Sequence, residues 1–159
     1  LLFLLSGDTE LVASLMSQLN TQGVYTVPEE LKSAIQAEFW AGCCGDAEAR
    51  RAIARVWQEN RYLCDPHTAT GWAAAEDYVN QTGDSRPMVV LSTASPYKFP
   101  AAVLAAIGGD CSGDEFDQME RLAEVSNVPI PKNLAGLREK PERHTDVIDK
   151  ETMLDYIMK

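Results

Sequence analysis

The apolar run Pro87-Met88-Val89-Val90-Leu91-Ser92 limits the folds open to this chain more than any other segment. Its apolar residues are consecutive rather than alternating, which is typical of a strand covered on both faces in a parallel sheet. A helix is predicted directly after it, capped by Ser95-Pro96 and ending at Gly108-Gly109. This strand–turn–helix order predicts an α/β fold.

Most of the remaining chain is predicted to be helical. Helix starts are expected at Asp8 or Thr9, at a Thr26-x-x-Glu29 capping box that has Pro28 near the first turn, and at Asp46. Further starts are expected at Asp65-Pro66 and near Asp114. The residues expected on buried helix faces are Leu11, Val12, Leu15, Met16, Leu19, Leu31, Ile35, Phe39, Trp40, Ala49, Ile53, Val56, Trp57, Trp72, Ala75, Tyr78 and Val79.

The two ends of the chain lead to further expectations. Leu1-Leu2-Phe3-Leu4-Leu5 lacks the start Met, basic region and cleavage site of a signal peptide, and is interpreted as the middle of a buried helix. Residues 141–146 are interpreted as a polar linker before a terminal helix over 148–158. Only one or two strands are predicted, too few for a self-sufficient sheet, so further strands are expected upstream of residue 1.

Composition excludes several classes of function. The chain has 159 residues and is 45% hydrophobic, enough for a core, so it is interpreted as one unit over 1–159. Its net charge of −10 is unsuited to a nucleic-acid surface, and no stretch approaches the ~20 apolar residues that cross a membrane. The four cysteines are expected to be reduced, which favours a cytoplasmic protein. They are Cys43, Cys44, Cys64 and Cys111.

The turn Ser92-Thr93-Ala94-Ser95-Pro96-Tyr97-Lys98-Phe99 is the first candidate site. Ligands of open α/β sheets bind beyond the carboxyl ends of the strands, and a helix N-terminus attracts anions. Lys98 adds positive charge there. The alternative, an ordinary strand–helix corner with Ser95 as the cap, stays open.

The second candidate is the helix start around His67, which is expected to line a cleft or to cap its helix. Cys64 and His67 have the spacing of two metal ligands, but a closed zinc site needs four, so no metal is expected. Ser92 or Ser95 could form a catalytic triad with His67 and Asp65 on paper, but the chain has no G-x-S-x-G motif. His144, in the polar linker, is expected to face solvent.

At these two segments the chain resembles threonine synthase, of the tryptophan-synthase-β-like (fold type II) group of pyridoxal-phosphate enzymes. The family carries an S/G-T-A-x-P-x-K-F stretch, matched by Ser92 to Phe99, and a D/E-P-H-x-A helix start, matched by Asp65 to Ala69. The opening Leu1 to Gly7 is similar to the family segment that follows an S-N-L-E-R helix start. The likeness spans nearly the whole chain and implies the C-terminal part of the large domain together with the C-terminal helices.

The resemblance implies a reaction and a cofactor. Threonine synthases convert O-phospho-L-homoserine and water to L-threonine and phosphate with pyridoxal 5′-phosphate. By this resemblance Thr93 hydrogen-bonds the pyridine nitrogen, Ser92 flanks the cofactor, and Lys98, Ser95 and His67 are substrate-proximal. The family's S-F-K-D lysine motif, which forms the Schiff base, and its G-N-F-G loop are absent from these residues. The chain alone is therefore expected to be inactive, with no catalytic residue of its own.

Two other interpretations stay open. One is part of another pyridoxal-phosphate lyase, such as a threonine dehydratase or cysteine synthase. The other is a non-enzymatic α/β binding domain that shares only the strand–turn–helix corner. Self-association through exposed core surface is also expected of a large domain that is only partly present.

Overall fold

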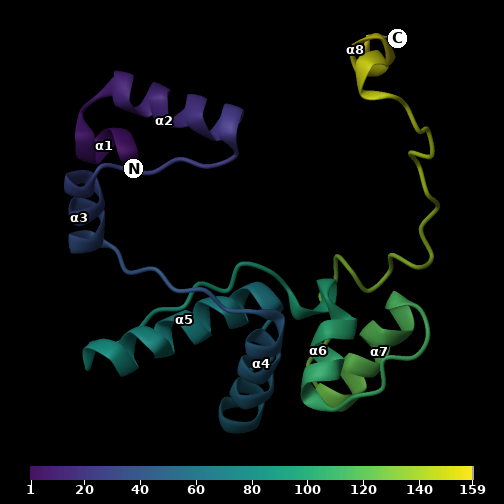
Figure 1. The fold of residues 1–159 in the computed structure, drawn as a ribbon. Helices are drawn as coiled ribbons and strands as arrows, with labels where there is room; N and C mark the ends of the chain where they lie inside the picture. The colour runs from purple at the N-terminus through teal and green to yellow at the C-terminus, as the bar shows by residue number, and fades with distance from the viewer. Residues whose placement is uncertain (159) are drawn as a thin grey trace.

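The computed structural model describes residues 1–158, and every regular element within that range is helical. The elements are α1 (Leu2–Ser6), α2 (Thr9–Gln22), α3 (Glu29–Glu38), α4 (Asp46–Asn60), α5 (Pro66–Thr82), η1 (Pro96–Lys98), α6 (Pro100–Ile107), α7 (Glu115–Ser126), η2 (Lys150–Thr152) and α8 (Met153–Ile157). Figure 1 shows α1–α3 as one group, α4–α7 as the main body, and a long tail that carries α8 away from both. None of the helices described over residues 1–158 is long and apolar enough to cross a membrane.

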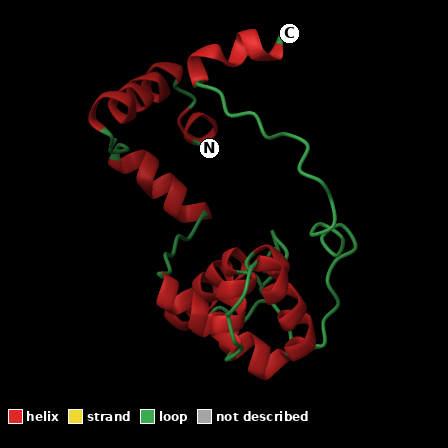
Figure 2. Ribbon diagram, turned by 90° about the vertical axis from the view of Figure 1, so that its right-hand side faces the viewer, coloured by secondary structure: helices red, strands yellow, loops and turns green. Residues whose placement is uncertain are grey.

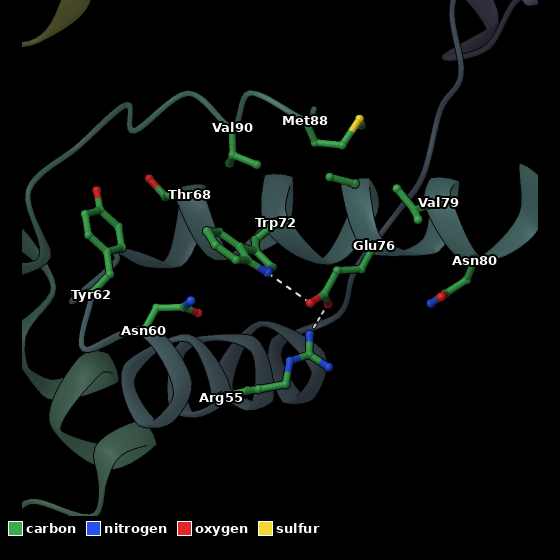
Figure 3. A pocket seen from close by; sticks show the side chains of 11 residues that line it. Arg55, Asn60, Tyr62, Thr68, Trp72, Glu76, Val79, Asn80, Met88 and Val90 are labelled. Carbon is green, nitrogen blue, oxygen red and sulfur yellow. Dashed lines mark hydrogen bonds and ion pairs between the residues drawn. The ribbon is translucent and has the colours of Figure 1, made fainter. Parts of the chain in front are cut away.

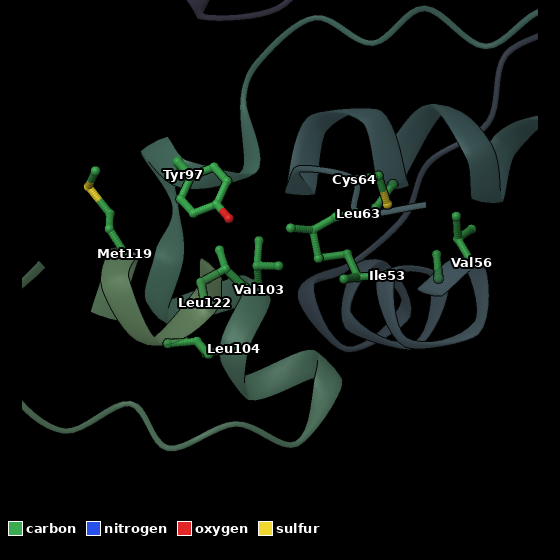
Figure 4. Packing of buried hydrophobic residues seen from close by; sticks show 11 residues of the cluster. Ile53, Val56, Leu63, Cys64, Tyr97, Val103, Leu104, Met119 and Leu122 are labelled. Atoms are coloured by element: carbon green, nitrogen blue, oxygen red, sulfur yellow. The ribbon is translucent and has the colours of Figure 1, made fainter. Parts of the chain in front are cut away.

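The main body is held together by side chains from α4, α5, α6 and α7, which pack on one another. Ile53 and Val56 of α4 meet Val103 and Leu104 of α6, and Leu122 of α7 closes the other side; each is at most 1% exposed (Figure 4). Burying an aliphatic side chain of this size contributes about 1.5–3 kcal/mol. The inward face predicted for α4 is therefore confirmed.

Several predicted helix boundaries are also confirmed. Asp65 caps α5 by accepting hydrogen bonds from the backbone N–H groups of His67 and Thr68, and the helix ends at Gly83 in a left-handed conformation. Asp114 caps α7 in a reciprocal capping box with Asp117. These signals are local, because a cap needs only residues within one turn of the helix start.

Two details of α3 were predicted wrongly. The Thr26–Glu29 capping box does not form, because Glu29 is the first helical residue instead of the third and Pro28 is the N-cap. Phe39 and Trp40 were expected on the buried face, but the helix ends at Glu38 and both side chains are exposed.

The N-terminal group is small. α1 packs against α2 and α3, where Leu15 and Leu31 are the buried residues. The predicted buried helix at the start of the chain is instead a five-residue helix with no buried residue, ended by Gly7. Leu4 is 83% exposed.

The chain stays on the body beyond α7 as far as Arg138, which pairs with Asp114 and Asp117, and the C-terminal tail leaves after it. Residues 141–149 are coil, so the predicted polar linker is extended chain that runs clear of the helices (Figure 2). The helix predicted over 148–158 is shorter than expected: one 3-10 turn over Lys150–Thr152 leads into α8. None of its residues is buried.

The segment Pro87 to Ser92, predicted as a buried strand, does not form a strand in this structure. It is open coil that passes beside α5, with Val89 85% and Leu91 74% exposed. A strand exists only through hydrogen bonds to a neighbour, and residues 1–158 include no other strand to pair with it. The helix-rich part of the predicted fold is present, while no parallel strand is seen in residues 1–158.

Candidate functional site

The turn from Ser92 to Phe99 is exposed at its start, at Ser92 and Thr93, and buried in the main body at Tyr97. Thr93 is exposed, and its hydroxyl makes no hydrogen bond with any side chain or backbone group in residues 1–158. Four residues later, Tyr97 is 2% exposed and donates a hydrogen bond to the carbonyl oxygen of Val128. The open position of Thr93 is therefore fixed from one end.

The helix predicted to begin at Ser95 is divided into two parts. The Ser95 hydroxyl accepts a hydrogen bond from the Tyr97 backbone N–H at 3.3 Å, but it caps only the 3-10 turn Pro96–Lys98. α6 begins later, at Pro100. The predicted anion-attracting helix start is therefore not located at Ser95. Lys98 is exposed at the end of the 3-10 turn.

Ser92 differs from Thr93 because its hydroxyl has a partner. The Tyr62 hydroxyl, in the loop between α4 and α5, donates to the Ser92 oxygen at 3.0 Å. This bond ties the extended segment to the loop. Sequence reasoning missed Tyr62, since nothing in the local pattern links positions 30 residues apart.

The start of α5 holds a buried carboxylate beside an exposed histidine. The side chain of Asp65 is 0% exposed and that of His67 is 62% exposed, and Asp65 Oδ1 lies 3.2 Å from His67 Nδ1. Asp65 Oδ2 accepts a hydrogen bond from the Thr68 hydroxyl. Burial raises the pKa of Asp65, but the hydrogen bonds from Thr68 and His67 outweigh it, so the net pKa is lowered.

The two predicted site segments meet in space. The His67 ring lies against the Phe99 ring, with centroids 5.0 Å apart and planes inclined by 54°. His67 therefore lines the surface where the Ser92–Phe99 turn rejoins the body. The structure brings together Ser92, His67 and the end of that turn, whereas no contact links Ser95 to His67 among the described hydrogen bonds.

The chain also forms an open groove of about 800 Å³ between α4, α5 and the extended segment (Figure 3). On its floor Glu76 accepts a hydrogen bond from the Trp72 indole N–H at 3.0 Å and pairs with Arg55. Met88 and Val90 form its opposite wall. Arg55 and Glu76 are 21 positions apart, and no local pattern in the sequence predicts their pairing.

The second half of α5 is less buried than predicted. Trp72, Ala75 and Val79 line the groove and are only partly covered, and Tyr78 packs edge-on against Trp40. The extended segment passes over this face without closing it.

Thiols and metal ligands do not form a centre in residues 1–158. All four cysteines are free, and no group of three His, Cys, Asp or Glu side chains is placed to hold a metal ion in this range. Burial, together with the negative charge of Asp65, raises the pKa of Cys64 to about 11. The thiolate that a metal requires is therefore disfavoured at this position.

Comparisons with known proteins give consistent results. The family model described as threonine synthase, C-terminal, matches residues 68–157. The chain is 32% identical to threonine synthase of Pseudomonas aeruginosa over 147 residues, which are 91% of this chain and 27% of that protein. It is 33% identical to human threonine synthase-like 2 over 105 residues, 65% of this chain and 22% of that protein.

A solved structure gives the same match. The crystal structure of pyridoxal-phosphate-bound threonine synthase from Brucella melitensis superposes with a TM-score of 0.63 at 35% identity, covering 79% of this chain and 29% of that one. The chain thus spans between about a fifth and a third of the length of these relatives.

Proposed function

Because the chain belongs to the threonine synthase C-terminal family, we propose that it works as the C-terminal part of a pyridoxal 5′-phosphate-dependent threonine synthase. The proposed reaction converts O-phospho-L-homoserine and water to L-threonine and phosphate. It is supported by the likeness to a threonine synthase over 91% of this chain and to a pyridoxal-phosphate-bound one over 79%.

The proposed cofactor contact is the Thr93 hydroxyl. It fits the pyridine nitrogen of the cofactor because it is a neutral group that is exposed and has no partner in residues 1–158. When bound, the cofactor withdraws electrons from the substrate carbon next to its nitrogen. A hydroxyl at the ring nitrogen, unlike a carboxylate, leaves that nitrogen largely unprotonated. Ser92 flanks the contact, and its bond from Tyr62 orients the extended segment.

The remaining proposed site residues differ in the groups that they can offer to a ligand. Lys98 is exposed and free to approach an anionic group, so we assign it to the substrate side. The Ser95 hydroxyl already accepts the Tyr97 N–H, which leaves its own hydrogen and one lone pair for a ligand. His67 presents an exposed ring next to the turn.

We also propose that the segment Pro87–Ser92 is a strand in the working enzyme, paired with strands that residues 1–158 do not supply. The exposure of Val89 and Leu91 supports this, since both are strongly apolar and lie beside the site. The same exposed surface supports self-association of the isolated chain. A cytoplasmic location, proposed from the free thiols, agrees with an enzyme of amino-acid biosynthesis.

The chain contains no S-F-K-D lysine motif, so by itself it is proposed to be inactive. We expect added pyridoxal 5′-phosphate to give no stable visible absorbance with these 159 residues. We expect such an absorbance, and phosphate release from O-phospho-L-homoserine, when the same residues form part of a chain that carries the lysine. A stable absorbance from the 159 residues alone would mean that another lysine acts, and Lys98→Ala would test the first candidate.

The observation that carries the proposal is the exposed hydroxyl of Thr93 within the family-matched region. In the lysine-bearing enzyme, Thr93→Val removes the hydroxyl while keeping the shape of the side chain. We expect it to weaken cofactor binding or turnover at least about 10-fold, the size expected for a lost hydrogen bond to a buried acceptor. His144→Ala, in the exposed linker, is the control and should change neither. Equal and negligible effects of the two substitutions would refute the role of Thr93.

A further inference from the structure

The Asp65–His67 pair has a geometry that its helix cap does not require. The cap is complete with the backbone N–H groups of His67 and Thr68, which Asp65 Oδ1 accepts at 2.9 and 3.3 Å. The imidazole is an additional partner at 3.2 Å. An exposed side chain gives up rotamer freedom to keep such a contact, and the helix cap does not account for that cost.

The protonation of the pair follows from the surroundings of the carboxylate. Asp65 is fully buried and accepts hydrogen bonds from three groups besides the ring, and these interactions lower its pKa. An ionised carboxylate can only accept, so the ring atom facing it, Nδ1, must carry a hydrogen. In a neutral imidazole the other nitrogen, Nε2, is then an acceptor with a free lone pair.

The position of that lone pair is also defined. Asp65 restrains the ring at one edge, and Phe99 packs against it at a centroid distance of 5.0 Å. The His67 side chain is 62% exposed, and its ring lies beside the end of the Ser92–Phe99 turn. Two contacts from different elements thus hold a largely open ring in one orientation.

We propose that Asp65 is a positioning residue that holds His67 in its Nδ1–H form, so that Nε2 of this exposed side chain serves as a fixed proton acceptor beside the Ser92–Phe99 turn. Its use in catalysis rests on the proposed function; the tautomer itself does not. The donor that Nε2 faces is an O–H or N–H group of the bound amino acid, or an O–H of water. The hydrogen moves toward Nε2 along that bond, and the nearby carboxylate stabilises the positive charge that develops on the ring.

The tautomer can be measured on the 159-residue chain, which contains only two histidines, His67 and His144. Nitrogen-15 NMR distinguishes protonated from unprotonated ring nitrogens, and His144→Gln assigns the signals. We expect His67 to be mainly Nδ1–H at neutral pH, and His144 to show the mixture of an unrestrained ring. A His67 signal like that of His144, or one with Nε2 protonated, would overturn the proposal.

Two variants separate positioning from folding. Asp65→Asn still caps a helix well but removes the charge and offers an amide that can donate, so His67 should lose its Nδ1–H preference. Phe99→Leu changes the ring contact without touching the carboxylate, so the tautomer should stay as in the wild type. An unchanged tautomer in Asp65→Asn would refute the role of Asp65. If Asp65→Asn loses its circular dichroism, the wild-type spectrum with its His144 reference still decides the tautomer.

The catalytic use is tested in the lysine-bearing enzyme with His67→Asn. The shorter amide can still donate to Asp65 but removes Nε2. We expect phosphate release from O-phospho-L-homoserine to fall about 100-fold or more, as for loss of a general base. A rate within twofold of the wild type would refute the acceptor role while leaving the proposed function intact. A wild-type enzyme that releases no phosphate would instead refute the proposed function, and the NMR result would be unaffected.

Discussion

The carboxylate of Asp65 offers a direct measure of how much one buried cap stabilises the main body. In Asp65→Ala, α5 loses its N-cap, which costs about 1 kcal/mol. The Thr68 hydroxyl, in a residue only 2% exposed, also loses its acceptor, which costs a further ~1–3 kcal/mol. We therefore expect the free energy of unfolding to fall by about 2–4 kcal/mol, the sum of these two terms.

The matched control is Asp114→Ala, which removes the N-cap of α7 in the same body. The Asp114 side chain is 62% exposed and its pair with Arg138 lies at the surface, so we expect a loss of about 1 kcal/mol. Urea unfolding followed by circular dichroism gives both values, with an unchanged slope as the sign that the same transition is measured. If Asp65→Ala costs no more than Asp114→Ala, the buried network around Asp65 adds nothing to the cap, and the reasoning fails.

Three further predictions use the same body. Burial raises the pKa of Asp65, but its hydrogen bonds lower it on balance, so the stabilisation from this carboxylate is present above an unfolded pKa of about 3.9 and is lost as pH falls through the folded value. The urea midpoint of the wild type should therefore drop more steeply below pH 4 than that of Asp65→Asn. Parallel pH curves for the two proteins would refute this. Burial and the charge of Asp65 raise the pKa of Cys64 to about 11. Ellman's reagent at pH 8 should therefore modify the exposed Cys43 quickly and Cys64 only in urea. Fast labelling of Cys64 in the folded chain would contradict its burial. Val89 is 85% exposed, so Val89→Lys should change the free energy of unfolding by less than about 0.5 kcal/mol. The same substitution should weaken self-association of the chain, measured by sedimentation velocity. An unchanged association constant would show that the chains do not associate through this segment.

Local signals in the sequence predicted most of the helical framework. Asp65 and Asp114 were assigned as helix starts, and each caps a helix in the structure. These assignments succeed because a cap and its N–H partners lie within three residues of each other. The predicted Thr26–Glu29 capping box does not form because it needs Glu29 at the third helical position. The helix instead starts at Glu29, so the Glu29 carboxylate is not placed to bond the backbone N–H of the capping residue.

Long-range contacts limit what the sequence could predict of the site. The hydroxyl residues of the Ser92–Phe99 turn were identified, but the bond from Tyr62 to Ser92 joins positions 30 apart and the His67–Phe99 contact joins positions 32 apart. No periodicity encodes either pairing. The Arg55–Glu76 pair, which forms the groove floor, likewise joins positions 21 apart. Residue type identified the candidates, and the packing of α4 on α5 determined which of them meet.

In the segment from Pro87 to Ser92, the sequence pattern and the structure disagree about burial. Its sequence has the composition of a strand buried on both faces, yet Val89 and Leu91 face solvent, and residues 1–158 provide neither a partner strand nor a second covering layer. Placing two such side chains in water instead of a core costs about 3–6 kcal/mol in total, a large share of a small domain's stability. A sequence that carries this cost is matched to surroundings beyond the four helices of the main body. The exposed hydroxyl of Thr93 follows directly on that segment, so the partner that covers Val89 and Leu91 would also enclose the site.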